Sequence, residues 1–151
     1  TEKELNTFIQ EFRDEFINLP VEEIAYPRSV NGLGKFRDSA SIYRKGTPMH
    51  IKGSLIYNHL ISERNLNAKY PYIQEGDKIK FIQLRQPNPL GANVISFMTK
   101  VPKELDIHKY IDYDIQYEKA FVEPLSFITD NIGWSIDRSY GTQTTLEEFF
   151  A

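Results

Sequence analysis

The chain has 151 residues, of which 40% are hydrophobic and 13% aromatic, and its formal net charge is −3. This length fits one domain with a sizeable core, and the aromatic content excludes a disordered chain. Because the chain has no cysteine, disulfides, thiolate metal sites and cysteine nucleophiles are all excluded.

The charges are distributed unevenly along the chain. Residues 1–18 carry two basic and five acidic side chains, residues 19–103 thirteen basic and six acidic, and residues 104–151 three basic and ten acidic. A polyanion responds to the charges within about 10 Å of it, so the basic middle matters more than the net charge. This middle fits a nucleic-acid-binding surface, and a solvated basic face is the competing interpretation.

The first segment predicts an amphipathic helix over residues 2–19. Thr1 and Glu4 have the spacing of a capping box, and Pro20 ends the helix. Apolar residues recur at helical spacing, at Leu5, Phe8, Ile9, Phe12 and Phe16. Residues 27–48 are rich in glycine and proline and predict a long loop.

The middle of the chain predicts a second helix and two strands. Thr47 and Pro48 fit the N-cap and first position of a helix over about 48–61. Alternating apolar residues predict strands over 78–85 and 94–98, antiparallel to each other. Residues 106–122 predict a further helix, Pro124 opens a short one through Ile128, and 131–140 predict irregular structure around Trp134. The predicted fold class is α+β and helix-rich, with a small antiparallel β element.

The last residues carry the strongest local motif. Gln143, Leu146, Phe149 and Phe150 have the spacing Gln-x-x-Leu-x-x-Phe-Phe, which one helical turn gathers into an apolar plug beside an amide. The spacing resembles the peptide by which replication proteins bind ring-shaped sliding clamps. We therefore divide the chain into a domain over 1–140 and a clamp-binding tail over 141–151. The alternative is a terminal turn that packs on the chain's own core.

A basic segment surrounds the predicted start of the second helix. Arg44, Lys45, His50 and Lys52 flank Thr47, and cations at a helix N-terminus oppose the helix dipole unless an anion is bound there. A phosphate fits this pattern, and an exposed loop with incidental charge is the alternative. Asp112 and Asp114, with Asp106 and Glu118 nearby, form the one carboxylate cluster that suggests a two-metal nuclease site. Positions i and i+2 of a helix point apart, so we expect no metal there.

Several motifs together resemble the C-terminal thumb of family B DNA polymerases of T-even-like and cyanophage-like phages. The resemblance covers roughly residues 5–151. It is carried by Lys45-Gly46-Thr47-Pro48-x-His50-Ile51-Lys52-Gly53, Glu75-Gly76-Asp77-Lys78-Ile79, Asn88-Pro89-Leu90-Gly91, Ile111-Asp112-Tyr113, Glu118-Lys119-x-Phe121-Val122-x-Pro124-Leu125 and the tail.

The resemblance implies a module that grips the primer–template duplex by its backbone and tethers the enzyme to its sliding clamp. The chain has Glu123 where the family has a basic residue, so the match to the family's grip is poorer on the side of residues 119–123. The positions that match the family's duplex contacts, together with the basic residues beside them, are Ser29, Asn31, Lys35, Arg44, Lys45, Thr47, His50, Lys52 and Lys119.

The motifs of polymerase chemistry are absent from these 151 residues. The palm carboxylates that hold Mg²⁺ and the triphosphate are missing, so we expect no cofactor in this chain, Mg²⁺ at the palm of the complete polymerase, and no polymerase activity from this chain alone. The expected partners are duplex DNA, the sliding clamp and the rest of the polymerase (palm, fingers and exonuclease), in the cytoplasm of the infected host. The alternative function is a free-standing, clamp-associated DNA-binding adaptor. A cut fragment and the product of a split polymerase gene both fit the sequence.

Overall fold

A computed structural model of the chain describes residues 1–36 and 45–138. The chain divides into two compact units. Thr1–Pro20 and Tyr113–Ala151 form the helical unit, and Val21–Asp112 form the basic unit, which is named for its fourteen basic and nine acidic side chains. Helices and a three-stranded antiparallel sheet occur together, which confirms the predicted α+β class.

The helical unit begins with α1 (Glu2–Phe16), as predicted. Thr1 is its N-cap and forms the predicted capping box with Glu4, and acidic residues in the first turn complement the helix dipole. The helix buries Ile9 and Phe16. The predicted capping chemistry and apolar spacing of this helix are therefore confirmed.

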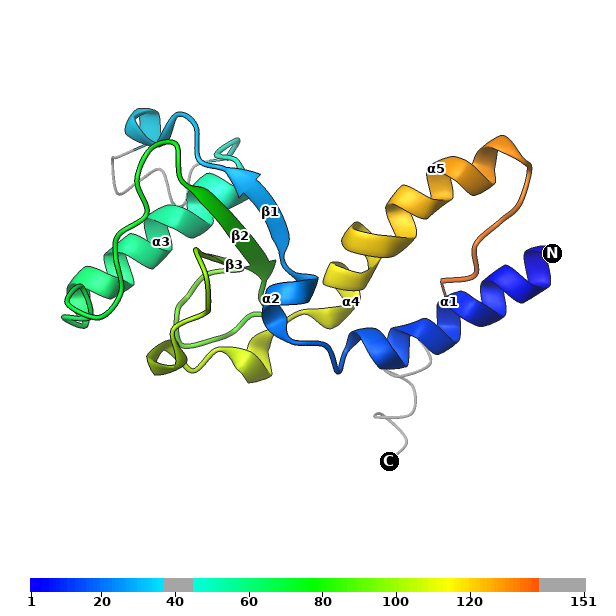
Figure 1. Cartoon of the computed structure of the whole chain (residues 1–151), viewed down its shortest axis with the longest axis horizontal. Helices are drawn as coiled ribbons and strands as arrows, with labels where there is room; N and C mark the ends of the chain where they lie inside the picture. Colours follow the sequence, from blue (N-terminus) through cyan, green and yellow to red (C-terminus); the bar gives the residue numbers. More distant parts are fainter. Residues whose placement is uncertain (37–44, 139–151) are drawn as a thin grey trace. The chain divides into compact units, whose positions relative to one another are not determined.

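The second half of the helical unit is one helical rod that runs in the opposite direction to α1 (Figure 1). It consists of α4 (Tyr113–Tyr117), a π-helical turn (Glu118–Val122) and α5 (Glu123–Asn131). The prediction of a helix over 106–122 and a separate one from Pro124 was wrong at both boundaries. Ile111 is extended and pairs with Leu84, which delays the helix to 113. At the other end, the π-helical turn continues directly into α5. The helix is therefore unbroken at Pro124, although the nitrogen of Pro124 has no hydrogen to donate to a helical hydrogen bond.

Aromatic rings hold α1 against this rod. The ring centroid of Phe121 lies 4.9 Å from that of Phe12, and the ring centroid of Tyr117 lies 5.0 Å from that of Phe16. The Tyr117 hydroxyl donates a hydrogen bond to the Ile9 carbonyl, and burial raises the pKa of Tyr117 to about 12. Stacked and tilted aromatic pairs of this kind stabilise a small core beyond the area that they bury.

The basic unit is built on a sheet of β1 (Tyr26–Ser29), β2 (Lys78–Gln83) and β3 (Val94–Phe97) in the order β1-β2-β3. The short helix α2 (Val21–Ile24) precedes β1. The predicted antiparallel pair is confirmed as β2 and β3. The prediction of a loop from residue 27 was wrong, because 26–29 form an edge strand whose hydrogen-bonding partner lies about fifty residues later.

Helix α3 (Met49–Glu63) packs on β3 and β2 (Figure 1). Gly53 makes this close approach possible, since a Cβ there would lie 2.9 Å from the Ser96 nitrogen and 3.1 Å from the Ile95 carbonyl carbon. Pro48, one residue later than predicted, is the N-cap. No helix in the described part of the chain is long and apolar enough to cross a membrane.

Candidate nucleic-acid interface

The loop after β1 carries three of the predicted contact residues. Ser29 ends β1, Asn31 follows it, and Lys35 lies in a 3₁₀ turn (Leu33–Phe36); all three side chains are exposed. The sequence thus places a hydroxyl, an amide and a cation on one short connection. All three can hydrogen-bond phosphate oxygens.

Hydrogen bonds to the turn before β2 fix this loop. The Glu75 carboxylate accepts from the Gly32 nitrogen at 2.7 Å and from the Leu33 nitrogen at 2.8 Å, and these bonds lower the pKa of Glu75. Val30 is fully buried, its nitrogen donates to the Asp77 carbonyl, and its carbonyl accepts from the Gly76 nitrogen. A carboxylate in the middle of a basic surface therefore has a structural task, which is to hold the loop in one conformation.

A second group lies at the start of α3. Lys45 is exposed in a turn where Gly46 adopts a φ of +100°, a value that glycine adopts readily, and Thr47 is half-buried just before the helix. Arg44 lies outside the described residues. The turn thus brings Lys45 to the surface at the N-terminus of α3, as the sequence predicts.

His50 and Lys52 belong to the first turn of α3. The ring of His50 is half-buried, with its centroid 6.4 Å from that of Phe81, and burial lowers its pKa below the usual value, with a further contribution from the charge of Arg28. The Nζ of Lys52 donates to Asn93 Oδ1 at 3.0 Å. His50 is therefore mostly neutral at pH 7. The Lys52 ammonium is held against Asn93, the residue that precedes β3.

Lys119 belongs to the helical unit, whereas the other described contact residues belong to the basic unit. Its Nζ is 2.8 Å from Glu123 Oε2, and this hydrogen bond raises the pKa of Lys119. Glu123 thus forms an ion pair with the predicted contact residue Lys119. The predicted clamp-binding residues Gln143, Leu146, Phe149 and Phe150 lie outside the described part of the chain.

Sequence reasoning missed two exposed cations, Arg28 and Lys78. The register pairs Arg28 with Ile79 and Ser29 with Lys78, and alternation along the strands puts Arg28 on the face of the sheet that His50 approaches and Lys78 on the other. Both were missed because β1 was not predicted. The sequence did contain a signal for this strand, because a proline within an otherwise extended segment such as Tyr-Pro-Arg-Ser is tolerated at the edge of a sheet.

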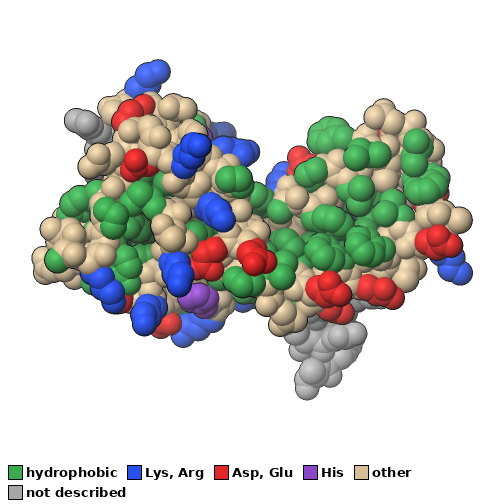
Figure 2. All heavy atoms as spheres, viewed as in Figure 1, with side chains coloured by type: hydrophobic (Ala, Val, Ile, Leu, Met, Phe, Trp, Pro, Cys, Tyr) green, Lys and Arg blue, Asp and Glu red, His purple; other side chains and the backbone are tan. Residues whose placement is uncertain are grey.

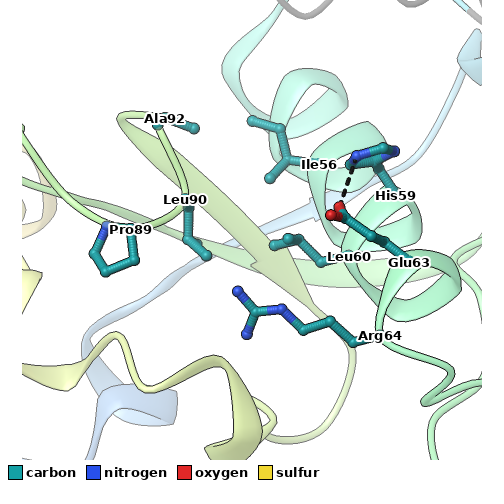
Figure 3. Close-up of a pocket in the computed structure, with 9 residues that line it drawn as sticks. Ile56, His59, Leu60, Glu63, Arg64, Pro89, Leu90 and Ala92 are labelled. Atoms are coloured by element: carbon teal, nitrogen blue, oxygen red, sulfur yellow. Dashed lines mark ion pairs between the residues drawn. The ribbon is translucent and has the colours of Figure 1, made fainter.

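Two pockets in the basic unit offer no catalytic chemistry. One, of about 200 Å³, has Ile56, Leu60 and Leu90 on its walls, and at its rim His59 Nε2 lies 3.0 Å from Glu63 Oε2 (Figure 3). The other, of about 490 Å³, lies between the loop at Leu33 and α3. Among the residues that the structure describes, no group of three or more His, Asp or Glu side chains is placed to hold a metal ion.

Only one residue of the predicted carboxylate pair lies on a helix, so the expected helical spacing of the two does not apply. Asp114 lies on α4 and binds Arg13, whose Nη2 is 2.6 Å from Asp114 Oδ1. Asp112 precedes that helix, and its nitrogen donates to the Gln83 carbonyl at the end of β2. The described basic side chains gather over the basic unit in Figure 2, where their charges add up to a positive local potential.

Comparison with known proteins identifies relatives of this segment. The chain matches no model of a known protein family. It is 29% identical to the DNA-directed DNA polymerase of Enterobacteria phage T4 over 136 residues, which are 87% of this chain and 15% of that polymerase. It is 33% identical to the DNA-directed DNA polymerase of Escherichia phage RB69 over 119 residues, 76% of this chain and 13% of that protein. The chain is thus related to a segment of phage DNA polymerases and spans only a small part of their length.

Proposed function

We propose that this chain is the C-terminal thumb part of a replicative family B DNA polymerase, and that it grips the primer–template duplex by its backbone. The similarity to two phage DNA polymerases over most of the chain supports the proposal. The observation that carries the duplex grip is the loop Ser29–Lys35. It presents Ser29, Asn31 and Lys35 at the surface while Glu75 and Val30 hold its backbone in place.

The proposed contacts position DNA without reading its sequence. Lysine, arginine and hydroxyl or amide side chains bind phosphate oxygens, which are the same for every base pair. Lys35 and Lys45 are exposed and bind phosphates directly. Arg28 adds a cation on the face of the sheet that His50 approaches, and Lys78 adds one on the opposite face, beside Ser29. Lys52 contributes through the local potential, because its ammonium is held by Asn93. Arg44, Thr47 and His50 complete the proposed contacts at the start of α3.

The chemistry belongs to the rest of the polymerase. The chain contributes by positioning the primer end for a palm that binds Mg²⁺ and the nucleotide. We propose that it acts with the other polymerase domains in the cytoplasm of an infected host. The purified chain, incubated with primer–template, Mg²⁺ and nucleotides, is expected to give no extension, and adding the remainder of the polymerase is expected to restore it. Binding of DNA without any such restoration would favour the free-standing adaptor.

The salt dependence of duplex binding tests the proposed grip. About four phosphate contacts give a slope of log affinity against log salt near −3 to −4, at roughly −0.9 per contact. Fluorescence anisotropy with two labelled duplexes of unrelated sequence measures this slope. Equal affinity for both duplexes with a steep slope supports the grip. A flat salt response or a strong preference for one sequence contradicts it.

The tail Gln143–Phe150 is the proposed tether to the sliding clamp. Phe149→Ala with Phe150→Ala is expected to abolish capture of the cognate clamp and to leave duplex binding and the melting temperature nearly unchanged, because the plug binds a partner. A large drop in melting temperature would instead support a turn packed on the chain's own core.

A further inference from the structure

One side of the rod formed by the π-helical turn and α5 carries a row of hydrophobic side chains, which ends just after α5. Phe121, Leu125, Ile128 and Ile132 are separated by four, three and four residues, the spacing that lines one side of a helix. Ile128 is 63% exposed and Ile132 is 57% exposed. The neighbouring side of the same rod buries Val122 and Thr129, and Phe121 packs against Phe12, so the row begins at the face that packs on α1 and continues into exposed surface.

The row continues onto α1. The ring of Phe8 is 52% exposed, and its centroid lies 6.4 Å from that of Phe121 and 5.7 Å from that of Phe12. We define the apolar face by Phe8, Phe121, Leu125, Ile128 and Ile132. Figure 2 shows hydrophobic side chains gathered over the helical unit. Contiguous exposed apolar surface of this kind marks an interaction site more often than scattered exposed residues do.

Charge decides which partner fits this face. The helical unit carries four basic and twelve acidic side chains, and Glu4, Glu11 and Glu15 are exposed on the same side of α1 as Phe8, at distances of four, three and seven residues from it. Nucleic acid and anionic lipid are repelled by such a rim. A second copy docking by the same face would bring two acidic rims together. The face therefore suits a different protein surface that is apolar at its centre and basic at its edge.

We propose that the apolar face docks onto the part of the polymerase that lies outside this segment, at a surface with an apolar centre and a basic rim. This inference rests on the proposed function. The two phage relatives are matched over only 15% and 13% of their length, so most of such an enzyme lies outside the segment and must hold it. The basic unit faces DNA in this arrangement, and the helical unit supplies the protein contact.

A pair of adjacent substitutions tests the docking. Ile128→Glu places a charge on the apolar face, whereas Phe127→Glu places the same charge on the next residue, which is 69% exposed and points about 100° away around the helix. The probe is the remainder of the cognate polymerase, expressed as a separate chain and titrated with the full 151-residue chain in calorimetry. We expect Ile128→Glu to weaken binding at least about tenfold and Phe127→Glu to change it by less than about twofold.

Three outcomes would overturn the inference. These are no binding of the remainder to the unsubstituted chain, an equal effect of the two substitutions, and a self-association of the unsubstituted chain in sedimentation that Ile128→Glu abolishes. Both substituted side chains are exposed, so an unchanged melting temperature separates lost docking from lost folding. Duplex binding measured with the same variants distinguishes the two proposals. Loss of docking with intact duplex binding supports the inference, and docking by a chain that fails to bind duplex contradicts the proposed grip alone.

Discussion

The two units of this chain differ in charge and in what they expose. The basic unit has fourteen basic and nine acidic side chains, and the helical unit has four and twelve. Among the large hydrophobic side chains exposed in the described residues, only Tyr72 belongs to the basic unit. The others belong to the helical unit, at Phe8, Ile115, Phe127, Ile128 and Ile132. A net charge of −3 describes neither surface, because it averages a basic region with an acidic region that exposes hydrophobic side chains.

The difference also shows in how each unit holds its surface. In the basic unit, main-chain hydrogen bonds to Glu75 fix a polar loop. In the helical unit, a cluster of rings around Phe12 and Phe121 holds two helical segments together and leaves part of its apolar side exposed. The lesson is that the two surfaces can be altered separately, by substitutions that respect the core of each unit.

The largest expected effect comes from Gly53→Ala in the basic unit. The added Cβ would meet the Ser96 backbone nitrogen at 2.9 Å, so α3 must move away from β3. Overpacking of this kind costs about 1–3 kcal/mol. We expect duplex binding to be lost at a lower urea concentration than in the unsubstituted chain.

Trp134, the only tryptophan, provides the control for this change. It lies in the helical unit, where its nitrogen donates to the Thr129 carbonyl. If the units are independent, the urea midpoint of tryptophan fluorescence stays where it is in the unsubstituted chain. Equal shifts of the fluorescence and duplex-binding midpoints would show that the two units unfold as one.

A smaller effect is expected from removing cations in the two units. Lys35→Gln with Lys45→Gln takes two exposed cations from the basic unit and should make the salt slope of duplex binding shallower by about 1.8. Lys119→Gln in the helical unit is the matched control, and it should change the slope little because Glu123 already pairs with Lys119. If Lys119→Gln made the salt slope shallower by as much as one lysine substitution in the basic unit does, Lys119 would also contact phosphate, and the assignment of DNA binding to the basic unit alone would be contradicted.

Elements that depend on residues close together in the sequence were predicted correctly, and elements that depend on residues far apart in the sequence were not. The capping box of Thr1 and the alternation over β2 and β3 are local patterns, and they predicted α1 and the antiparallel pair. Strand β1 was missed because it contains Pro27 and its hydrogen-bonding partner is distant in the sequence. The later start of α4 likewise depends on the bridge between Leu84 and Ile111.

The candidate site followed the same rule. The resemblance pointed to Ser29 and Asn31, the basic charge of the middle of the chain pointed to Lys35, and the structure places all three at the end of β1 and in the loop that follows it. Arg28 and Lys78 were missed because their positions depend on a strand pairing that no local pattern encodes. The role of Glu75 was missed for the same reason, since its two donors lie more than forty residues before it. Local chemistry can therefore be predicted from sequence, whereas neighbours across the sheet require the fold.

The smallest expected effect comes from two buried tyrosines, one in each unit. Burial raises the pKa of Tyr117 in the helical unit and of Tyr57 in the basic unit from 10 to about 12. Because each folded pKa lies above the unfolded value, the stabilisation is fully present below pH 10 and is lost as the pH rises toward 12. Tyr117→Phe removes the hydroxyl that bonds the Ile9 carbonyl and should cost about 1 kcal/mol at neutral pH.

The pH dependence of stability between pH 10 and 12 then distinguishes the two units. Phenylalanine has no proton to lose, so the deficit of Tyr117→Phe, measured by Trp134 fluorescence in urea, should shrink as the pH rises from 10 to 12. Tyr57→Phe, which removes a hydroxyl bonded to the Pro71 carbonyl, should alter the urea dependence of duplex binding and not the tryptophan signal. A constant deficit of Tyr117→Phe across this range would mean that ionisation of Tyr117 does not oppose folding. A response of Trp134 to Tyr57→Phe would mean that the two units share one core.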